Sequence, residues 1–255
     1  MLILLSPAKT IDFSVEPQTQ KFTLPEFTEE AQKLVQLLRK FSSKQLQELM
    51  SINSKLADLN AKRFFDWHLP FSPANARQAL LVFKGEVYTG LEAQHLSAED
   101  IDFAQEHVRI LSGLFGVLRP LDLIQPYRLE MGTRLKTPKG SDLYEFWGAK
   151  ITKSIKKALA DSGSNLLVNL ASNEYFKSLD AKKLNAEIIT PMFKDFHNGE
   201  YRFLTIYGKR ARGMMTRFII QNRISNPEDI KSFDEDGYIF NPALSSGNEW
   251  IFTRG

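Results

Sequence analysis

The sequence predicts a mixed α+β fold: a single compact domain with a mixed sheet, an antiparallel hairpin near residues 187–207 and surrounding helices. The hairpin is indicated by Asn198-Gly199, which stands between two strand-like runs and favours a two-residue turn. Short apolar runs typical of buried strands also alternate with segments whose apolar residues recur at helical spacing. The 255 residues contain no internal repeat or low-complexity linker, so we expect one domain over 1–255.

The first elements follow from local patterns near the N-terminus. Leu2–Leu5 is a short buried strand that ends at Ser6-Pro7. A helix is expected from Thr28, because Ala31, Leu34, Val35 and Leu38 share one face. Two shorter helices are expected around 43–50 and 53–66.

The middle of the chain predicts two strands and two helices. Leu80–Phe83 is predicted to be a strand. Ser97 and Asp100 have the spacing of a capping box, so a helix should begin there. Asp142–Asp161 is predicted to be one long amphipathic helix, and Leu166–Leu170 a central strand.

The Asn198-Gly199 turn fixes a register for the hairpin. It pairs Asp195 with Arg202, Phe196 with Tyr201, and Phe193 with Leu204. The first pair is opposite in charge and the others are apolar or aromatic, as favourable cross-strand pairs are. We therefore expect Asp195 to neutralise Arg202.

The distribution of charge is uneven. Tyr201–Pro227 contains no acidic residue and six basic ones: Arg202, Lys209, Arg210, Arg212, Arg217 and Arg223. Without these six, the chain has 27 basic residues against 30 acidic ones, so its net charge of +3 arises locally. A local concentration of positive charge favours a polyanionic partner such as nucleic acid.

A helix over about 209–223 would place its basic residues on one side, with Gly213 near the middle of that side. Glycine costs about 1 kcal/mol inside a helix, so its presence needs a reason. One reason is the close approach of a phosphate backbone, and the other is tight packing of a neighbouring strand. The basic side itself is either a phosphate-binding surface or a solvated, internally paired face.

Residues 111–132 form the second candidate site. Gly113 and Gly116 follow the capped helix and suggest a helix-hairpin-helix element near 97–130, whose backbone N–H groups could bind phosphate. Arg119 and Arg128 would add positive charge. The alternative is a tight turn in the core, with glycines required for steric reasons.

Ser6-Pro-Ala-Lys-Thr10 directly follows the first strand. Lys9 and Thr10 at a strand end can contact phosphate, but the P-loop pattern is absent. If the protein is an enzyme acting on a phosphorylated ligand, a pocket could be lined by Ser6, Lys9, Thr10, Lys194, Arg210 and Arg212. The alternative is an ordinary exit from a strand.

Several site classes are not predicted. The chain has no cysteine, and its four histidines lack metal-ligand spacing. The G-x-S-x-G and G-x-G-x-x-G patterns are both absent. We therefore expect no metal, no cofactor and no identifiable catalytic residue. No apolar stretch approaches the ~20 residues that span a bilayer, and no signal-peptide pattern opens the chain, so a cytoplasmic location is expected.

Several sequence blocks together resemble the YaaA family of bacterial peroxide-stress-response proteins. The resemblance covers Met1 to Phe252 and rests on these blocks: Leu5–Thr10, Phe83–Gly90, Leu111–Gly132, Leu143–Gly148, Val168–Lys177 and Lys209–Met215. It implies a mixed α/β domain with a basic cleft, and binding of double-stranded DNA through a helix-hairpin-helix element. It also implies protection from hydrogen peroxide by limiting free intracellular iron.

The first functional hypothesis is a DNA-binding protein of the peroxide response. Its phosphate-contacting and hairpin residues would be Lys9, Gly113, Gly116, Arg119, Arg128, Lys194, Lys209, Arg210, Arg212 and Arg217, giving affinity without sequence preference. The alternative is an enzyme acting on a nucleic acid or a phosphorylated small molecule in the same cleft. Direct iron sequestration is disfavoured, because the chain lacks cysteine and a di-iron E-x-x-H pairing.

Overall fold

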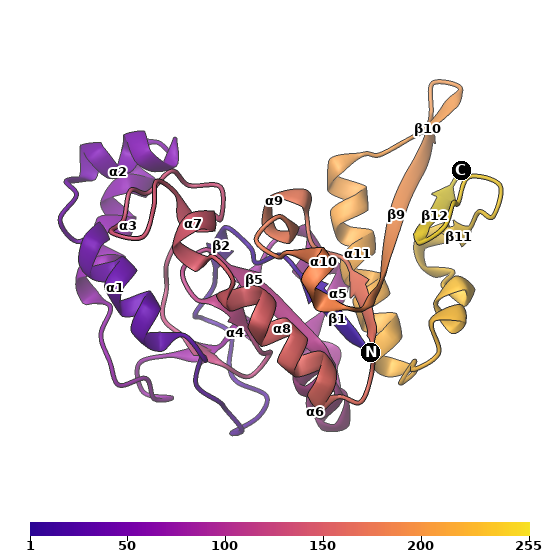
Figure 1. Ribbon diagram of the computed structural model, residues 1–255, viewed down its shortest axis with the longest axis horizontal. Helices are drawn as coiled ribbons and strands as arrows, with labels where there is room; N and C mark the ends of the chain where they lie inside the picture. The colour runs from indigo at the N-terminus through magenta and orange to yellow at the C-terminus, as the bar shows by residue number, and fades with distance from the viewer.

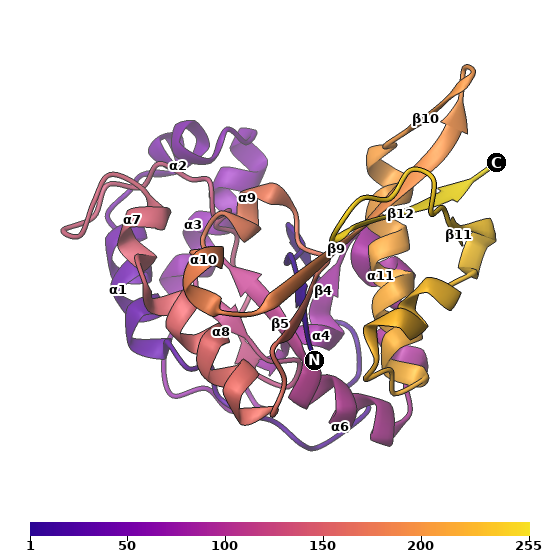
Figure 2. The ribbon, with the colours of Figure 1, turned by 45° about the vertical axis from the view of Figure 1, so that its right-hand side comes forward.

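The computed structural model describes residues 1–255 and is built around a mixed sheet of eight strands, in the order β11-β12-β9-β8-β1-β5-β6 with β10 paired to β9. Neighbouring strands from β12 to β5 are parallel, while β6, β10 and β11 pair antiparallel with their neighbours. Figures 1 and 2 show helices α1–α3 at one end of the molecule and the β9–β10 hairpin projecting at the other. The predicted α+β class with a mixed sheet is confirmed.

The strands are short except for β9. Their bounds are β1 Leu2–Leu5, β2 Thr10–Ile11, β3 Arg77–Gln78, β4 Phe83–Lys84, β5 Val108–Ser112, β6 Gly116–Leu118, β7 Leu123–Ile124, β8 Leu166–Asn169, β9 Glu187–His197, β10 Glu200–Arg202, β11 Ile239–Phe240 and β12 Glu249–Arg254. Outside the main sheet, β2 pairs with β4 and β3 with β7.

The helices range from single turns to the 17 residues of α11. Their bounds are α1 Thr28–Leu38, α2 Ser43–Met50, α3 Ser54–Asp66, α4 Ala79–Val82, α5 Glu86–Leu91, η1 Ala93–His95, α6 Ala98–His107, α7 Leu143–Trp147, α8 Lys150–Asp161, α9 Asn173–Phe176, α10 Ala181–Leu184, α11 Thr205–Gln221, η2 Pro227–Ser232 and η3 Glu235–Gly237.

Strands β1 and β8 form the middle of the sheet. All four residues of β1 are fully buried, and so are Leu167 and Val168 of β8. Strands that are covered on both faces have continuous apolar sequences, which is why these two could be recognised from sequence. The predicted strand at 2–5 and the predicted central strand near 166–170 are both confirmed.

The predicted hairpin register is confirmed at two of its three pairs. Tyr201 lies opposite Phe196, and Arg202 lies opposite Asp195. The third pair does not form, because β10 ends at Arg202 and Leu204 is already the N-cap of α11.

Three predicted elements are wrong. Leu80–Phe83 is mostly the helical turn α4, with only its last residue in β4. The long helix over Asp142–Asp161 is two helices, α7 and α8, separated at Gly148, whose φ of 49° interrupts helical geometry.

The third predicted element that is wrong is the helix-hairpin-helix element near 97–130. The capped helix α6 is present, with the predicted Ser97–Asp100 capping box. It is followed by the antiparallel strands β5 and β6, and not by a second helix. Both strands lie in the main sheet. The hydrogen bonds and burial that a strand gains there decide the structure, and the two glycines by themselves do not impose a turn between helices.

Candidate functional site

A cavity of about 530 Å³ opens at the carboxyl ends of the parallel strands β1 and β8. Ligand sites in open parallel sheets are commonly found at such strand ends, and this volume is within the usual range for small-molecule pockets. Its polar lining includes Ser6, Lys9, Thr10, Lys84, Tyr88, Glu130, Ser172, Glu174, Lys209 and Arg212. The chain segments that follow β1 and β8 therefore meet the helix α11 around one hollow.

The hydroxyls beneath the cavity are fixed by hydrogen bonds between distant segments. Ser6 Oγ accepts from the backbone N–H of Ser172 at 2.9 Å and donates to Ser172 Oγ at 3.3 Å. Tyr88 Oη donates to the backbone carbonyl of Ser6 at 3.0 Å. Burial raises the pKa of the Tyr88 hydroxyl well above its ordinary value. These contacts hold the exit of β1 against α5 and the exit of β8.

Two of the cavity's lysines are paired with carboxylates. Lys9 Nζ lies 2.6 Å from Glu130 Oε2, and Arg128 Nη2 lies 2.9 Å from the other oxygen of Glu130. Lys84 Nζ lies 3.0 Å from Asp12 Oδ2. Each of these two lysines therefore has a carboxylate partner within the protein, and Lys9 shares its partner with Arg128.

The other two cations of the cavity, Lys209 and Arg212, come from α11 and differ from the first two. Their side chains form no ion pair or hydrogen bond with the protein. Arg212 is half-buried, its Nε is closed to solvent without a partner, and burial lowers the pKa of its guanidinium. The ring of Phe203 lies 5.7 Å from the guanidinium carbon. Lys209 and Arg212 are thus the cations of the cavity without an ion-pair partner, while Glu86 and Glu174 are its carboxylates without one.

The remaining cations of the acid-free segment divide into two groups. Arg210 is exposed and, like Lys209 and Arg212, has no acidic partner. The others are paired: Arg202 with Glu200, Arg217 with Glu92 and Glu235, and Arg223 with Asp100. The basic side expected on this helix is therefore partly an internally paired face.

The expected ion pair between Asp195 and Arg202 is wrong. Asp195 is buried and accepts hydrogen bonds from Arg254 Nε at 2.8 Å and Tyr238 Oη at 2.9 Å. Arg202 is exposed and bonds to Glu200 on its own strand. Facing positions in a register do not require side-chain contact when one residue of the pair is buried under another element.

Gly213 lies where α11 crosses α5. A Cβ atom at Gly213 would approach the carbonyl oxygen of Val87 to 1.8 Å, and one at Gly90 would approach that of Arg210 to 2.1 Å. Tight packing of a neighbouring element therefore explains this glycine, although the neighbour is a helix and not the strand considered from sequence.

Gly113 and Gly116 are buried and have steric roles. A Cβ at Gly113 would come within 2.3 Å of the Leu129 carbonyl oxygen, and one at Gly116 within 2.8 Å of the Trp147 ring. Gly116 also has a φ of +69°. Trp147 Nε1 donates to the Gly113 carbonyl at 3.0 Å. Both glycines fit the alternative of a tight core turn.

The other sequence-predicted residues lie apart from the cavity. Arg119 pairs with the buried carboxylate of Asp122 at 3.1 Å and lines a different hollow with Arg109. Lys194 is half-buried on β9, and neither it nor Arg210 lines the cavity. The structure thus brings together Lys9, Lys209 and Arg212, and it adds the sequence-predicted pocket residues Ser6 and Thr10.

Sequence reasoning missed the part of the cavity contributed by the exit of β8. Ser172, Asn173, Glu174 and Tyr175 line it, and Glu174 Oε1 accepts from the backbone N–H of Gly132 at 2.9 Å. Polar residues directly after a fully apolar strand are a usable signal, since strand ends at one edge of a parallel sheet share one site.

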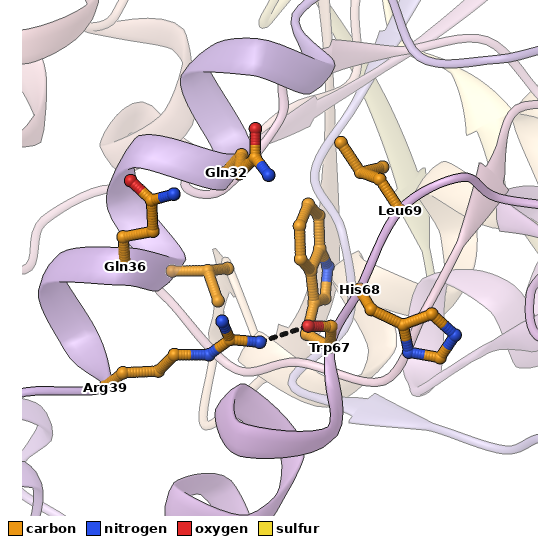
Figure 3. A pocket seen from close by; sticks show the side chains of 7 residues that line it. Gln32, Gln36, Arg39, Trp67, His68 and Leu69 are labelled. Atoms are coloured by element: carbon orange, nitrogen blue, oxygen red, sulfur yellow. Dashed lines mark hydrogen bonds between the residues drawn. The ribbon is translucent and has the colours of Figure 1, made fainter.

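A separate, smaller hollow of about 190 Å³ lies beside α1. Figure 3 shows the side chains that line it. Arg39 donates there to the carbonyls of Phe64, Phe65 and Trp67 at the end of α3. The Trp67 indole N–H is buried without a partner. None of the sequence-predicted site residues lies in this hollow.

The structure contains no cluster of three or more histidine, aspartate or glutamate side chains arranged to hold a metal ion. None of its helices has the length and apolar character needed to cross a membrane.

Comparison with known families places these features in context. The family model described as "Peroxide stress protein YaaA" matches residues 1–244. The match includes every residue that lines the cavity and all of α11. It confirms the resemblance drawn from the sequence.

Proposed function

The chain belongs to the peroxide stress protein YaaA family, and from this premise we propose that it binds double-stranded DNA in the cytoplasm during the response to hydrogen peroxide. In this proposal it limits oxidative DNA damage and free intracellular iron. Binding is dominated by phosphate contacts and is independent of base sequence.

The observation that supports DNA binding most directly is the exposed pair Lys209 and Arg210 on α11, which has no carboxylate partner. Cations that are already paired, such as Arg217, would have to give up an ion pair to contact a phosphate. A cation without an ion-pair partner loses no contact within the protein when it binds a phosphate and displaces only counterions from the DNA. Its net gain in binding free energy is therefore larger than that of a paired cation. We therefore assign the principal phosphate contacts to Lys209 and Arg210.

The test is a titration of duplex DNA at several salt concentrations with the variant Lys209→Ala/Arg210→Ala. Each lost phosphate contact lowers the slope of log K against log salt by about 0.9, so the slope should fall by about 1.8. The matched control is Lys153→Ala/Lys156→Ala, which removes two exposed, unpaired lysines from α8. Equal affinities and slopes for the two double variants would contradict the proposal.

The link to peroxide and iron needs a test in cells. Cells that lack the protein should accumulate more free iron and more DNA strand breaks after hydrogen peroxide than cells that contain it. Restoring the chain should reverse both effects, and restoring Lys209→Ala/Arg210→Ala should reverse them less. Full protection by that variant would separate the cellular role from DNA binding.

A second candidate function is catalysis on a nucleic acid or a phosphorylated small molecule. The cavity at the ends of β1 and β8 favours it, because cations and carboxylates such as Glu130 and Glu174 line the same hollow. Such mixed linings can bind a charged substrate and exchange protons with it.

This candidate is tested by incubating the protein with 5′-phosphorylated oligonucleotides and phosphate monoesters, and by following the products with mass spectrometry. Turnover should be lost in Glu130→Gln and in Glu174→Gln. No conversion of any substrate would eliminate this candidate, and unchanged conversion by both variants would exclude Glu130 and Glu174 from the catalysis.

A further inference from the structure

We infer that the cavity between the exits of β1 and β8 and the helix α11 is a binding site for a phosphate monoester, with Arg212 as the principal contact for its phosphate group. The inference rests on the cavity described for the second candidate function. It holds whether or not the bound molecule is converted.

The first argument is the free-energy cost of burying Arg212 without an ion-pair partner. Its Nε is closed to solvent without a hydrogen-bond partner, and no carboxylate lies within ion-pair distance. A desolvated charge without an ion-pair partner costs stability, and an anion bound by the terminal N–H groups of the same guanidinium would offset that cost. The same desolvation also lowers the pKa of the Arg212 guanidinium.

The second argument is geometry. Phe203 lies over the guanidinium of Arg212, with 5.7 Å between its ring centroid and the guanidinium carbon. A cation–π contact of this kind holds the guanidinium beside the ring and leaves its terminal N–H groups available to a ligand. Those groups match two oxygens of a phosphate in a bidentate contact.

The third argument is charge. Lys209 precedes Arg212 by three residues on α11, so both reach the same hollow. Lys9 and Lys84 also line the cavity, but each is balanced by a carboxylate at 3.0 Å or less. Glu86 and Glu174 also line the cavity without an ion-pair partner. The match to the dianion of a phosphate monoester therefore rests on the adjacency of Lys209 and Arg212 on one helix, and not on the total charge of the lining.

The fourth argument is size and setting. About 530 Å³ is room for more than a bare phosphate. The hydroxyls of Ser6 and Ser172, fixed by their mutual hydrogen bonds, supply further polar groups at the strand ends. The organic part of the ligand would lie along this polar floor and against Tyr88 and Tyr175, which also line the cavity.

The experiment is calorimetric titration of the DNA-free, full-length protein with adenosine monophosphate, inorganic phosphate and acetate. Adenosine monophosphate and phosphate should bind, and acetate should bind at least tenfold more weakly. Arg212→Met should weaken adenosine monophosphate binding at least tenfold, and Lys209→Met several-fold. Lys156→Met lies on α8, which contributes no residue to the cavity, and should bind as the original chain does.

Thermal unfolding distinguishes a binding role from a structural one. Arg212→Met should melt at the same temperature as the original chain or higher when no ligand is present, because a desolvated charge has been removed. Adenosine monophosphate should raise the melting temperature of the original chain but not of this variant. A lower melting temperature of the ligand-free variant would assign Arg212 a structural role and overturn the inference.

Other outcomes also decide the question. Absence of adenosine monophosphate binding at millimolar concentration, or equal affinity for acetate, overturns the inference. Because DNA binding is measured separately through Lys209→Ala/Arg210→Ala, a failure here leaves that proposal intact. Binding without conversion supports the inference and removes only the catalytic candidate.

Discussion

Gly213 of α11 lies against the backbone carbonyl of Val87 in α5, so closely that a Cβ atom on Gly213 would approach that oxygen to 1.8 Å. The contact places α5, which carries Tyr88, beside the part of α11 that carries Lys209 and Arg212. The distance between α5 and α11, which both line the cavity, is therefore set by the lack of a side chain at Gly213.

Gly213→Ala should destabilise the protein. Overpacking typically costs about 1–3 kcal/mol, and a Cβ at 1.8 Å from a backbone oxygen belongs at the upper end of that range. A gain of about 1 kcal/mol in helix propensity opposes this cost, so we expect a net loss of up to about 2 kcal/mol. Urea denaturation measures it. Gly85→Ala is the control, since its nearest neighbour would be Ala8 Cβ at 3.4 Å. A more stable Gly213→Ala would show that the helices separate without cost.

Asp195→Ala should be among the most damaging changes in the hairpin. Asp195 is buried between Arg254 and Tyr238, and removing one partner of a buried ion pair costs about 3 kcal/mol or more. Denaturant unfolding gives the value. Glu200→Ala should cost no more than about 0.5 kcal/mol, because its pair with Arg202 is exposed. Similar losses for the two would contradict the larger role assigned to the buried pair of Asp195 and Arg254.

Glu30 should contribute to acid unfolding. Its hydrogen bond to Lys150 lowers the pKa of Glu30 below the ordinary 4.5. The folded protein therefore binds this proton more weakly than the unfolded chain, so the stabilisation is complete above pH 4.5 and is lost as pH falls through the folded pKa.

The measurement is the free energy of unfolding of the original chain and of Glu30→Gln at pH 7, 5 and 3.5. Their difference should be largest at pH 7 and shrink towards pH 3.5. Asp161→Asn, which removes an exposed pair with Lys157, should show little of this trend. A difference between the original chain and Glu30→Gln that is independent of pH would contradict the assignment.

Arg128 and Lys9 share the carboxylate of Glu130 but should differ in importance. Arg128 is the more buried of the two, with a side chain 16% exposed against 61% for Lys9. Arg128→Met should cost about 2 kcal/mol, and Lys9→Met about 0.5 kcal/mol or less. Thermal or urea unfolding compares them. Equal costs for the two variants would contradict the larger role assigned to the more buried Arg128.

Elements with a local physical cause could be predicted. The apolar runs of β1 and β8, the capping box of α6 and the Asn198-Gly199 turn each act within a few residues, and each is found where the sequence indicated it. Two candidate residues on one helix, Lys209 and Arg212, could likewise be grouped by spacing alone.

Elements that depend on the rest of the molecule could not be predicted. Gly113 and Gly116 suit a turn between helices as well as one between strands, and the place of β5 beside β1 decides between them. The break at Gly148 is similar, since the segments on either side have uninterrupted helical periodicity.

The sequence by itself determined that six cations lie in one acid-free segment, because the order of residues along the chain fixes which charges are close in sequence. Tertiary structure decided which of them remain free. Glu92, Glu235 and Asp100 reach Arg217 and Arg223 from distant segments, while Arg212 is left without a carboxylate above the exits of β1 and β8. Ion pairing acts over a few ångströms in space, and only the folded chain sets those distances.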